Sequence, residues 1–96
     1  MPTRKRQQRY QLSIAPTARR QLAEELPAAV AFAAYEFITD ALLDNPYRVS
    51  KPLHPPLQDQ YSARRGTYRV IYRIDDDARV VIVLVVVPRS DAYRSR

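Results

Sequence analysis

The stretch that decides the fold is "YSARRGTYRVIYRIDDDARVVIVLVVV", which runs from position 61 to 87. It predicts three strands, at about 58–64, 67–74 and 79–87, joined by turns at 65–66 and 75–77. Side chains alternate between the two faces of a strand, so the apolar residues at 68, 70, 72 and 74 share one face. Arg69 and Arg73 therefore lie on the opposite face. The middle strand is expected to turn one side to a core and a basic side away from it.

The third predicted strand contains "VVIVLVVV" at 80–87, which is apolar on both faces. A strand of this kind belongs in the centre of a sheet, covered by helices on one side and partly covered on the other. Pro88 then ends it, because proline has no backbone N–H to donate. Gly66 is the only glycine in the chain, and we expect it in a turn that needs a positive φ.

The first half of the chain predicts one strand and two helices. Residues 8–14 alternate as a half-buried strand, and "APTARRQLAEEL" is typical of a helix that starts at Pro16 or Thr17. Pro27 ends that helix or opens the next, which runs to Leu43 with an apolar stripe. Residues 47–57 hold three prolines and are expected to form a loop. The order β-α-α-β-β-β predicts an α+β fold, in which a helical hairpin packs on one face of a mainly antiparallel four-stranded sheet.

Length and composition narrow the class of protein. Ninety-six residues suit one domain over 1–96, with a flexible basic N-terminus at 1–7. The chain has no cysteine and a single histidine, so disulfides and sites built on Cys or several His ligands are excluded. We find no transmembrane segment and no secretory signal in the sequence, and therefore expect a soluble cytoplasmic protein without a membrane partner.

The charge points to a polyanionic partner. The net charge is +6, and fourteen of the sixteen basic residues are arginine, which suits bidentate phosphate contacts. The charge is also segregated: residues 1–20 carry six bases and no acid, and 21–44 carry five acids and no base. Nucleic acid or an acidic protein would fit this pattern. The alternative is a surface whose charge only aids solubility.

Four arginines are expected near one another on the sheet face that the helices leave open. Arg64, Arg69 and Arg73 fall on that face by alternation, and Arg89 enters from the end of the adjacent strand. Their mutual repulsion favours an anion between them. Two interpretations stay open at this point, a phosphate-binding face and a charged face that is satisfied within the protein.

The block "SARRGTYRVIYRIDD", with "YRVSKPL" upstream and "PRSDAYR" downstream, resembles the RelE branch of the RelE/ParE toxin superfamily. The resemblance covers nearly the whole chain. It implies a small toxin that binds the ribosomal A site and cuts the mRNA there, with an acidic RelB-like antitoxin as its partner. It also implies an RNA cleavage without metal or other cofactor, in which a ribose 2′-oxygen attacks the adjacent phosphorus to leave a 2′,3′-cyclic phosphate.

The resemblance assigns four catalytic positions. Arg69 would stabilise the extra negative charge of the phosphorane, and Arg89 would stabilise or protonate the leaving 5′-oxygen. Tyr93 would stack on a base, orient the nucleophile or assist proton transfer, unless its ring simply packs on the sheet edge. Arg64 matches another basic position near the scissile phosphate.

The remaining candidates are contacts to RNA. Lys51 is expected to grip an RNA backbone, and Arg19 and Arg20 to contact ribosomal RNA. Arg65 and Arg73 complete this set, although Arg65 belongs to the predicted turn. An acid across the hairpin would give Arg73 a structural role instead.

The sequence departs from the family pattern where a general base is needed. Gln60 and Ser62 stand where some relatives carry lysines, and Pro88 stands where many carry a histidine. His54, between prolines, is expected to be a bystander, so the base stays unassigned. Two alternatives follow: a ParE-like gyrase poison with the same fold, and a non-catalytic basic module that binds RNA or protein. We expect an acidic antitoxin segment to use the apolar last strand, the Ala-rich helix and the basic face.

Overall fold

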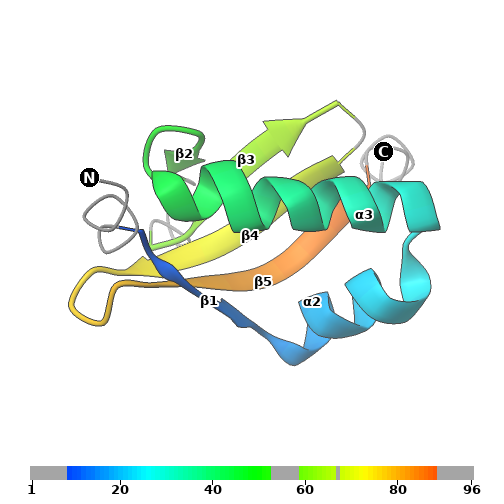
Figure 1. Ribbon diagram of the computed structural model, residues 1–96, viewed down its shortest axis with the longest axis horizontal. Coiled ribbons are helices and arrows are strands. Elements are labelled where there is room, and N and C mark those ends of the chain that lie inside the picture. The colour runs from blue at the N-terminus through cyan, green and yellow to red at the C-terminus, as the bar shows by residue number, and fades with distance from the viewer. Residues whose placement is uncertain (1–8, 53–58, 67, 89–96) are drawn as a thin grey trace.

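The computed structural model describes residues 9–52, 59–66 and 68–88, and Figure 1 shows their arrangement. The helical elements are α2 (Pro16–Arg20), η1 (Gln21–Glu25), α3 (Ala28–Phe37) and η2 (Ile38–Leu42), where η marks a π-helical turn. The strands are β1 (Gln11–Ile14), β2 (Lys51–Pro52), β3 (Tyr61–Arg65), β4 (Tyr68–Asp75) and β5 (Val80–Pro88). The helices lie on one face of the sheet, and none of the described elements covers the other face, called the open face below (Figure 1).

The sheet has five strands in the order β1-β5-β4-β3-β2. β1 pairs with β5 in parallel, and every other pair is antiparallel. The predicted α+β class and the central place of the last strand are confirmed. The expected strand count of four was one too low, because Lys51–Pro52 forms a short edge strand inside the segment predicted as a loop. Proline is tolerated there, since an edge strand needs hydrogen bonds on one side only.

Both helices begin at prolines, as the sequence indicates. Pro16 is the first residue of α2, a position where the missing N–H costs nothing, and Pro27 caps the start of α3. Each helix runs on without a break into a π-helical turn. No helix within the described ranges is long and apolar enough to cross a membrane.

The core lies between the helices and β3, β4 and β5. In β4, Tyr68, Val70 and Tyr72 are buried, as the alternation predicts, and Arg73 is exposed. The largest fully buried side chains are Tyr72, Ile38, Leu42, Val70, Val81, Val83, Val86 and Pro46. The other face of β5 is only half-buried, so the side chains of this all-apolar strand are partly exposed on the open face.

A bulge in β5 keeps its inward side chains in phase with the helices. The pairing between β4 and β5 shifts between Ile71 and Tyr72, which leaves one extra residue in β5. Just beyond it, the Gln21 side chain donates to the Val86 carbonyl at 2.7 Å and accepts from the Val86 N–H at 2.8 Å. A single amide therefore satisfies both backbone groups of Val86 at an edge that β1 does not reach.

One expectation about the turns was wrong. Gly66 does not have a positive φ; Arg79, with φ of 58°, is the only described residue that has one. Arg79 ends the turn between β4 and β5, and its guanidinium lies 4.2 Å from the centre of the Tyr10 ring. This cation–π contact helps to offset the cost of the left-handed backbone.

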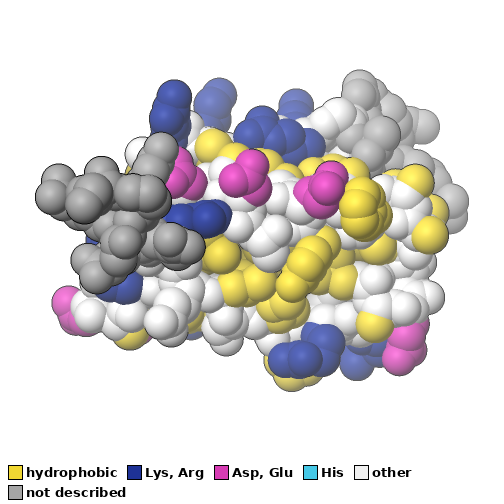
Figure 2. Space-filling model, in the orientation of Figure 1, with side chains coloured by type: hydrophobic (Ala, Val, Ile, Leu, Met, Phe, Trp, Pro, Cys, Tyr) yellow, Lys and Arg dark blue, Asp and Glu magenta, His cyan; other side chains and the backbone are white. Residues whose placement is uncertain are grey.

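The helical face differs in charge from the sheet. Figure 2 shows acidic side chains in a row along α3 and the segment after it, with hydrophobic side chains beside them. On α3, Phe32 is 66% exposed and Tyr35 is 48% exposed. The helical side of the molecule therefore carries acids and exposed apolar side chains.

Candidate nucleic-acid interface

The pairing register brings two arginines side by side on the open face. Arg64 of β3 lies directly opposite Arg69 of β4. Directly opposed residues of antiparallel strands share a face and have Cα atoms about 5 Å apart. Their neighbours Ala63 and Val70 are fully buried against the helices, so both arginines project to the open side. The expectation that Arg64 and Arg69 share the uncovered face is confirmed.

A third cation joins this row through β2. Lys51 lies opposite Ser62 of β3, and Ser62 lies opposite Ile71 of β4. These three residues therefore also face the open side, one step along the sheet from the arginine pair. Lys51 sits on a strand, and its place beside Ser62 is fixed by the strand pairing.

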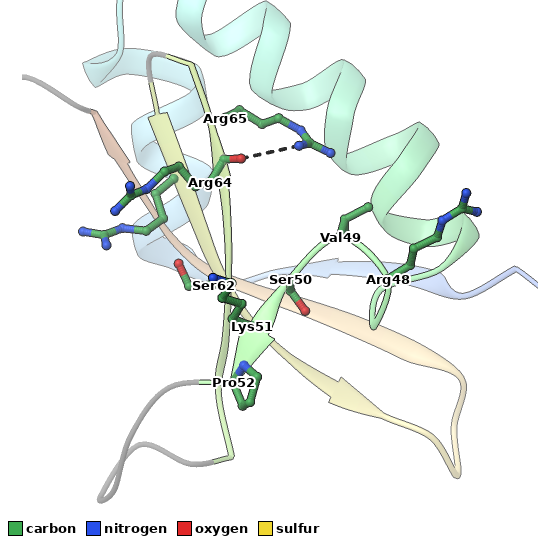
Figure 3. Close-up of a pocket in the computed structure, with 9 residues that line it drawn as sticks. Arg48, Val49, Ser50, Lys51, Pro52, Ser62, Arg64 and Arg65 are labelled. Carbon is green, nitrogen blue, oxygen red and sulfur yellow. Dashed lines mark hydrogen bonds between the residues drawn. The ribbon is translucent and has the colours of Figure 1, made fainter.

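These residues surround a hollow of about 690 Å³. Figure 3 shows the residues around it, which come from β3 and from the chain that leads into β2. The lining residues are Arg48, Val49, Ser50, Lys51, Pro52, Ser62, Arg64, Arg65 and Arg69. No carboxylate lines the hollow, so its described walls are uniformly cationic or neutral.

Arg69 is the lining residue whose polar atoms are least satisfied. Its side chain is half-buried, and its Nε is buried without a hydrogen-bond partner among the described residues. A buried donor without a partner costs about 1–3 kcal/mol, and an anion that accepts from it removes that cost. A phosphate oxygen is the acceptor that a planar guanidinium binds in bidentate fashion. Arg69 is thus prepared for an anionic ligand.

Arg65 does not belong to the same row. Figure 3 shows the Arg64 and Arg65 side chains on opposite sides of β3. The Arg65 guanidinium lies over the Phe37 ring of α3, 4.2 Å from its centre. Arg65 is the last residue of β3, and the expectation that it belongs to the turn was wrong. Its packing on Phe37 ties the strand to the helix at the rim of the hollow.

The other predicted RNA contacts lie away from the hollow. Arg73 shares the open face with Arg69, but its Nε lies 3.4 Å from Asp59 Oδ2, an acid across the hairpin. This is the pairing that the sequence allowed for Arg73. Arg19 and Arg20 are exposed on α2, where Arg20 pairs with Glu25 at 3.3 Å.

Four sequence predictions fall outside the described residues, one of them the flexible N-terminus at 1–7. Arg89, Tyr93 and His54 are among them, so their predicted roles stay predictions. The described chain ends at Pro88, opposite Tyr68. This end of β5 is the end of the sheet that holds the Arg64–Arg69 pair.

Sequence reasoning missed part of the lining. Arg48 and Ser50 were not singled out, although the stretch "YRVSK" places a second cation three residues before Lys51. That spacing was a usable signal. Without the pairing of β2 with β3, nothing related the stretch to the arginines of the hairpin.

A cluster of two tyrosines and one carboxylate stands outside the hollow, at the opposite end of β4. The Tyr10 hydroxyl donates to Asp76 Oδ1 at 2.5 Å, and the Tyr47 hydroxyl donates to Asp76 Oδ2. These bonds lower the pKa of Asp76, and the bond to Asp76 raises the pKa of Tyr47 well above its usual value. Burial first, and then the bond to Asp76, raise the pKa of Tyr10. Each bond therefore favours an ionised Asp76 and neutral tyrosines.

Comparison with known proteins shows which family the chain belongs to. The family model for the ParE toxin of the parDE type II toxin–antitoxin system matches residues 12–93. Among curated proteins, Toxin RelE of Mycobacterium tuberculosis is 45% identical over 85 residues, covering 88% of this chain and 87% of that protein. Toxin RelG of the same organism is 46% identical over 85 residues, covering 88% and 97%.

Solved structures agree with this placement. The toxin–antitoxin complex RelBE2 of Mycobacterium tuberculosis matches with a TM-score of 0.80 at 44% identity, over 84% of this chain and 99% of that one. The isolated RelE toxin of E. coli matches in fold, with a TM-score of 0.67 at 23% identity, over 90% and 93%. The predicted resemblance is confirmed: the chain belongs to the RelE/ParE superfamily of type II toxin–antitoxin toxins, on its RelE side.

Proposed function

We propose that the protein is the toxin of a type II toxin–antitoxin module and that it cuts mRNA in the A site of the ribosome. The observation that carries this proposal is the Arg64–Arg69 pair on an open sheet face, with a buried and unpartnered Nε on Arg69. The similarity to toxins named RelE and RelG supports the choice of RNA as the polyanion.

The proposed reaction is an internal transfer within the RNA. The 2′-oxygen of one ribose bonds to the adjacent phosphorus, and the bond from phosphorus to the 5′-oxygen of the next nucleotide breaks. The products are a 2′,3′-cyclic phosphate and a 5′-hydroxyl. The 2′ proton leaves to a base, and the 5′-oxygen gains one proton. The phosphorane between these states carries more negative charge than the substrate, so fixed cations aimed at it lower the barrier.

The described residues supply the cations for this step. Arg69 is assigned to the phosphorane and Arg64 to the same phosphate from the neighbouring strand. Lys51 on β2 and Arg48 on the chain that leads into β2 also line the hollow, and both are assigned to the adjoining backbone. Arg89 at the leaving oxygen and Tyr93 at the nucleophile remain the assignments that the family resemblance implies. Alignment by the ribosome is expected to supply much of the rate, because bringing reacting groups together is itself a large effect.

The antitoxin is expected to be acidic and to bind the open face. That face combines the arginines with partly exposed apolar side chains of β5, which suits an acidic amphipathic segment. The Ala-rich α3 suits such a partner less well, because acids lie along its exposed side (Figure 2). The complexes of related toxins with their RelB proteins support a partner of this kind.

Induced expression followed by mapping of mRNA 5′ ends tests the proposal. We expect cuts in translated messages, in phase with codons, and 5′-hydroxyl ends. Arg69→Ala should abolish the cuts, and Arg73→Ala should preserve them, since Arg73 is paired with Asp59 away from the hollow. Untouched messages in cells that the wild-type protein arrests would rule the proposal out.

A gyrase poison is the second candidate, because the matching family model is described as ParE. It shares the fold and would act on DNA gyrase rather than on mRNA. The same induced cells distinguish the two: a poison leaves gyrase trapped on cleaved DNA and messages intact. A chain that does neither is a non-catalytic binding module.

A further inference from the structure

The chain that carries Arg48 to the hollow is anchored far from the hollow itself. Asp76 lies in the turn between β4 and β5, at the far end of β4 from Arg69. Its two carboxylate oxygens accept one hydroxyl each, from Tyr10 before β1 and from Tyr47 after η2. One side chain thus joins three segments that are distant in sequence.

Tyr47 is held on its ring as well as on its hydroxyl. The ring meets Tyr61 of β3 edge-on, with centres 5.6 Å apart, and Tyr61 stacks on Tyr72 of β4 at 6.1 Å. The Tyr72 hydroxyl donates to the Pro46 carbonyl at 2.5 Å. The chain at 46–47 is therefore attached to the sheet by two hydroxyl bonds and one aromatic row.

The anchored residues lead directly to Arg48. Ser50 Oγ donates to the Pro46 carbonyl at 2.9 Å, and the Arg48 N–H donates to the Asn45 side chain at 3.2 Å. These short-range bonds fold 45–50 into a compact turn, so a shift of Tyr47 moves Arg48 with it. Lys51, Arg64 and Arg69, by contrast, lie on paired strands and are held by the sheet.

We propose that Asp76, through Tyr47, is a positioning residue that sets the position of Arg48 relative to Lys51, Arg64 and Arg69 around the hollow. The inference rests on the proposed function in one respect, namely that the hollow holds an RNA backbone. Asp76 touches no ligand and acts only through the chain that it holds.

Electrostatics alone predicts the opposite effect of removing this charge. Asp76→Asn raises the net charge from +6 to +7, which should strengthen the attraction for any polyanion. If Asp76 positions Arg48, the same substitution weakens RNA binding instead. Asp77, next to it in the turn and also exposed, is the matched control because Asp77→Asn changes the charge equally.

Two tyrosine variants distinguish the Asp76 bond that holds the chain at Arg48 from the Asp76 bond that holds the chain before β1. Tyr47→Phe keeps the ring on Tyr61 and removes only the hydroxyl that binds Asp76. Tyr10→Phe removes the other hydroxyl, which belongs to the residue just before β1 and not to the chain that carries Arg48. Each substitution removes a single hydroxyl group. Circular dichroism is the control that each variant is folded at the temperature of the assays.

Three measurements on the full-length protein then test the positioning role of Asp76. In Asp76→Asn and Tyr47→Phe we expect amide hydrogen exchange at 48–50 to rise about tenfold, as local opening becomes easier. The dissociation constant for a short single-stranded RNA, at fixed salt, should rise by about the same factor, which is about 1.4 kcal/mol of binding free energy. Asp77→Asn and Tyr10→Phe should stay within about twofold on both readouts.

Cleavage of mRNA on ribosomes is the third measurement, and it should fall in the same two variants. Unchanged exchange or unchanged RNA affinity in Asp76→Asn would overturn the positioning role, as would an equal response in Asp77→Asn. A wild-type protein that cuts no message would instead overturn the proposed function. The exchange and RNA-affinity results would still decide the role of Asp76 in that case.

Discussion

Arg69 combines two properties that rarely occur together in a strand residue. Its backbone belongs to a central strand between β3 and β5, and its guanidinium opens onto the hollow with Nε unsatisfied. Such a group cannot be replaced by a generic cation, because an ammonium presents a point charge and no planar fork.

Arg69→Lys is therefore expected to lose activity although the charge is kept. We expect mRNA cleavage on ribosomes to fall by about 10²- to 10³-fold, the usual effect of removing one donor aimed at developing charge. Arg73→Lys is the matched control on the same strand face. Cleavage at the wild-type rate in Arg69→Lys would show that only its charge matters.

Lys51 offers a test of the unassigned proton acceptor. It is the only lysine that lines the hollow within the described ranges. We expect it to hold a phosphate, so Lys51→Arg should keep most of the activity. Lys51→Met should lose about tenfold and make RNA binding less dependent on salt. A Lys51→Arg variant as inactive as Lys51→Met would instead identify Lys51 as the base, since arginine does not release its proton.

At the scale of secondary-structure elements, the alternation of apolar and polar residues predicted more of the structure than the expected ends of the strands and helices did. The two faces of β4 and the shared face of Arg64 and Arg69 follow from a period of two, which is a local property of the chain. The pairing of Lys51 with Ser62 could not be predicted, because it joins segments across three prolines. The hydrogen bonds of Tyr10 and Tyr47 to Asp76 could not be predicted either, because a long-range hydrogen bond produces no periodic pattern in the sequence.

Gln21 is an element-scale feature whose removal should be costly. Gln21→Glu keeps an acceptor for the Val86 N–H but sets a carboxylate against the Val86 carbonyl. We expect a loss of about 1–3 kcal/mol in the free energy of unfolding, measured by urea denaturation. Gln11→Glu, an exposed change of the same kind on β1, should cost less than about 0.5 kcal/mol.

Gly66 should tolerate a side chain, contrary to what its rarity suggests. Its φ is not positive, and a Cβ added to it would meet none of the described residues within 4 Å, its chain neighbours aside. Gly66→Ala should raise the free energy of unfolding by about 0.4–1 kcal/mol, because alanine restricts the unfolded chain. The comparison with the wild type in urea checks this. A loss of stability would mean that the turn needs the freedom of glycine after all.

For the whole molecule, the Asp76 cluster sets a pH range of stability. The folded-state pKa of Asp76 lies below its unfolded value of about 3.9, so its contribution is present above that pH and is lost as the pH falls through the folded-state pKa. The folded-state pKa of Tyr47 lies above its unfolded value of about 10. Its contribution is therefore present below pH 10 and is lost as the pH rises through the folded-state pKa.

The stability difference between the wild type and Asp76→Asn should follow this range. We expect it to be largest between about pH 4 and pH 10 and to shrink on the acid side. Thermal unfolding of both proteins at pH 3 and pH 7 measures it. Asp77→Asn should show no such dependence, and a difference that grows toward pH 3 would contradict the assignment.

The parallel pairing of β1 with β5 also governs how the protein is made. Gln11 lies beside Val80, so the first strand waits for nearly seventy more residues before its neighbour exists. Until β5 leaves the ribosome, β4 keeps an unpaired edge and the helices have no valines of β5 to cover. A nascent chain that lacks β5 therefore has no complete sheet to hold its arginines in place. A stop codon or frameshift upstream of residue 80 should therefore leave no residual toxicity, however much of the arginine hairpin it spares.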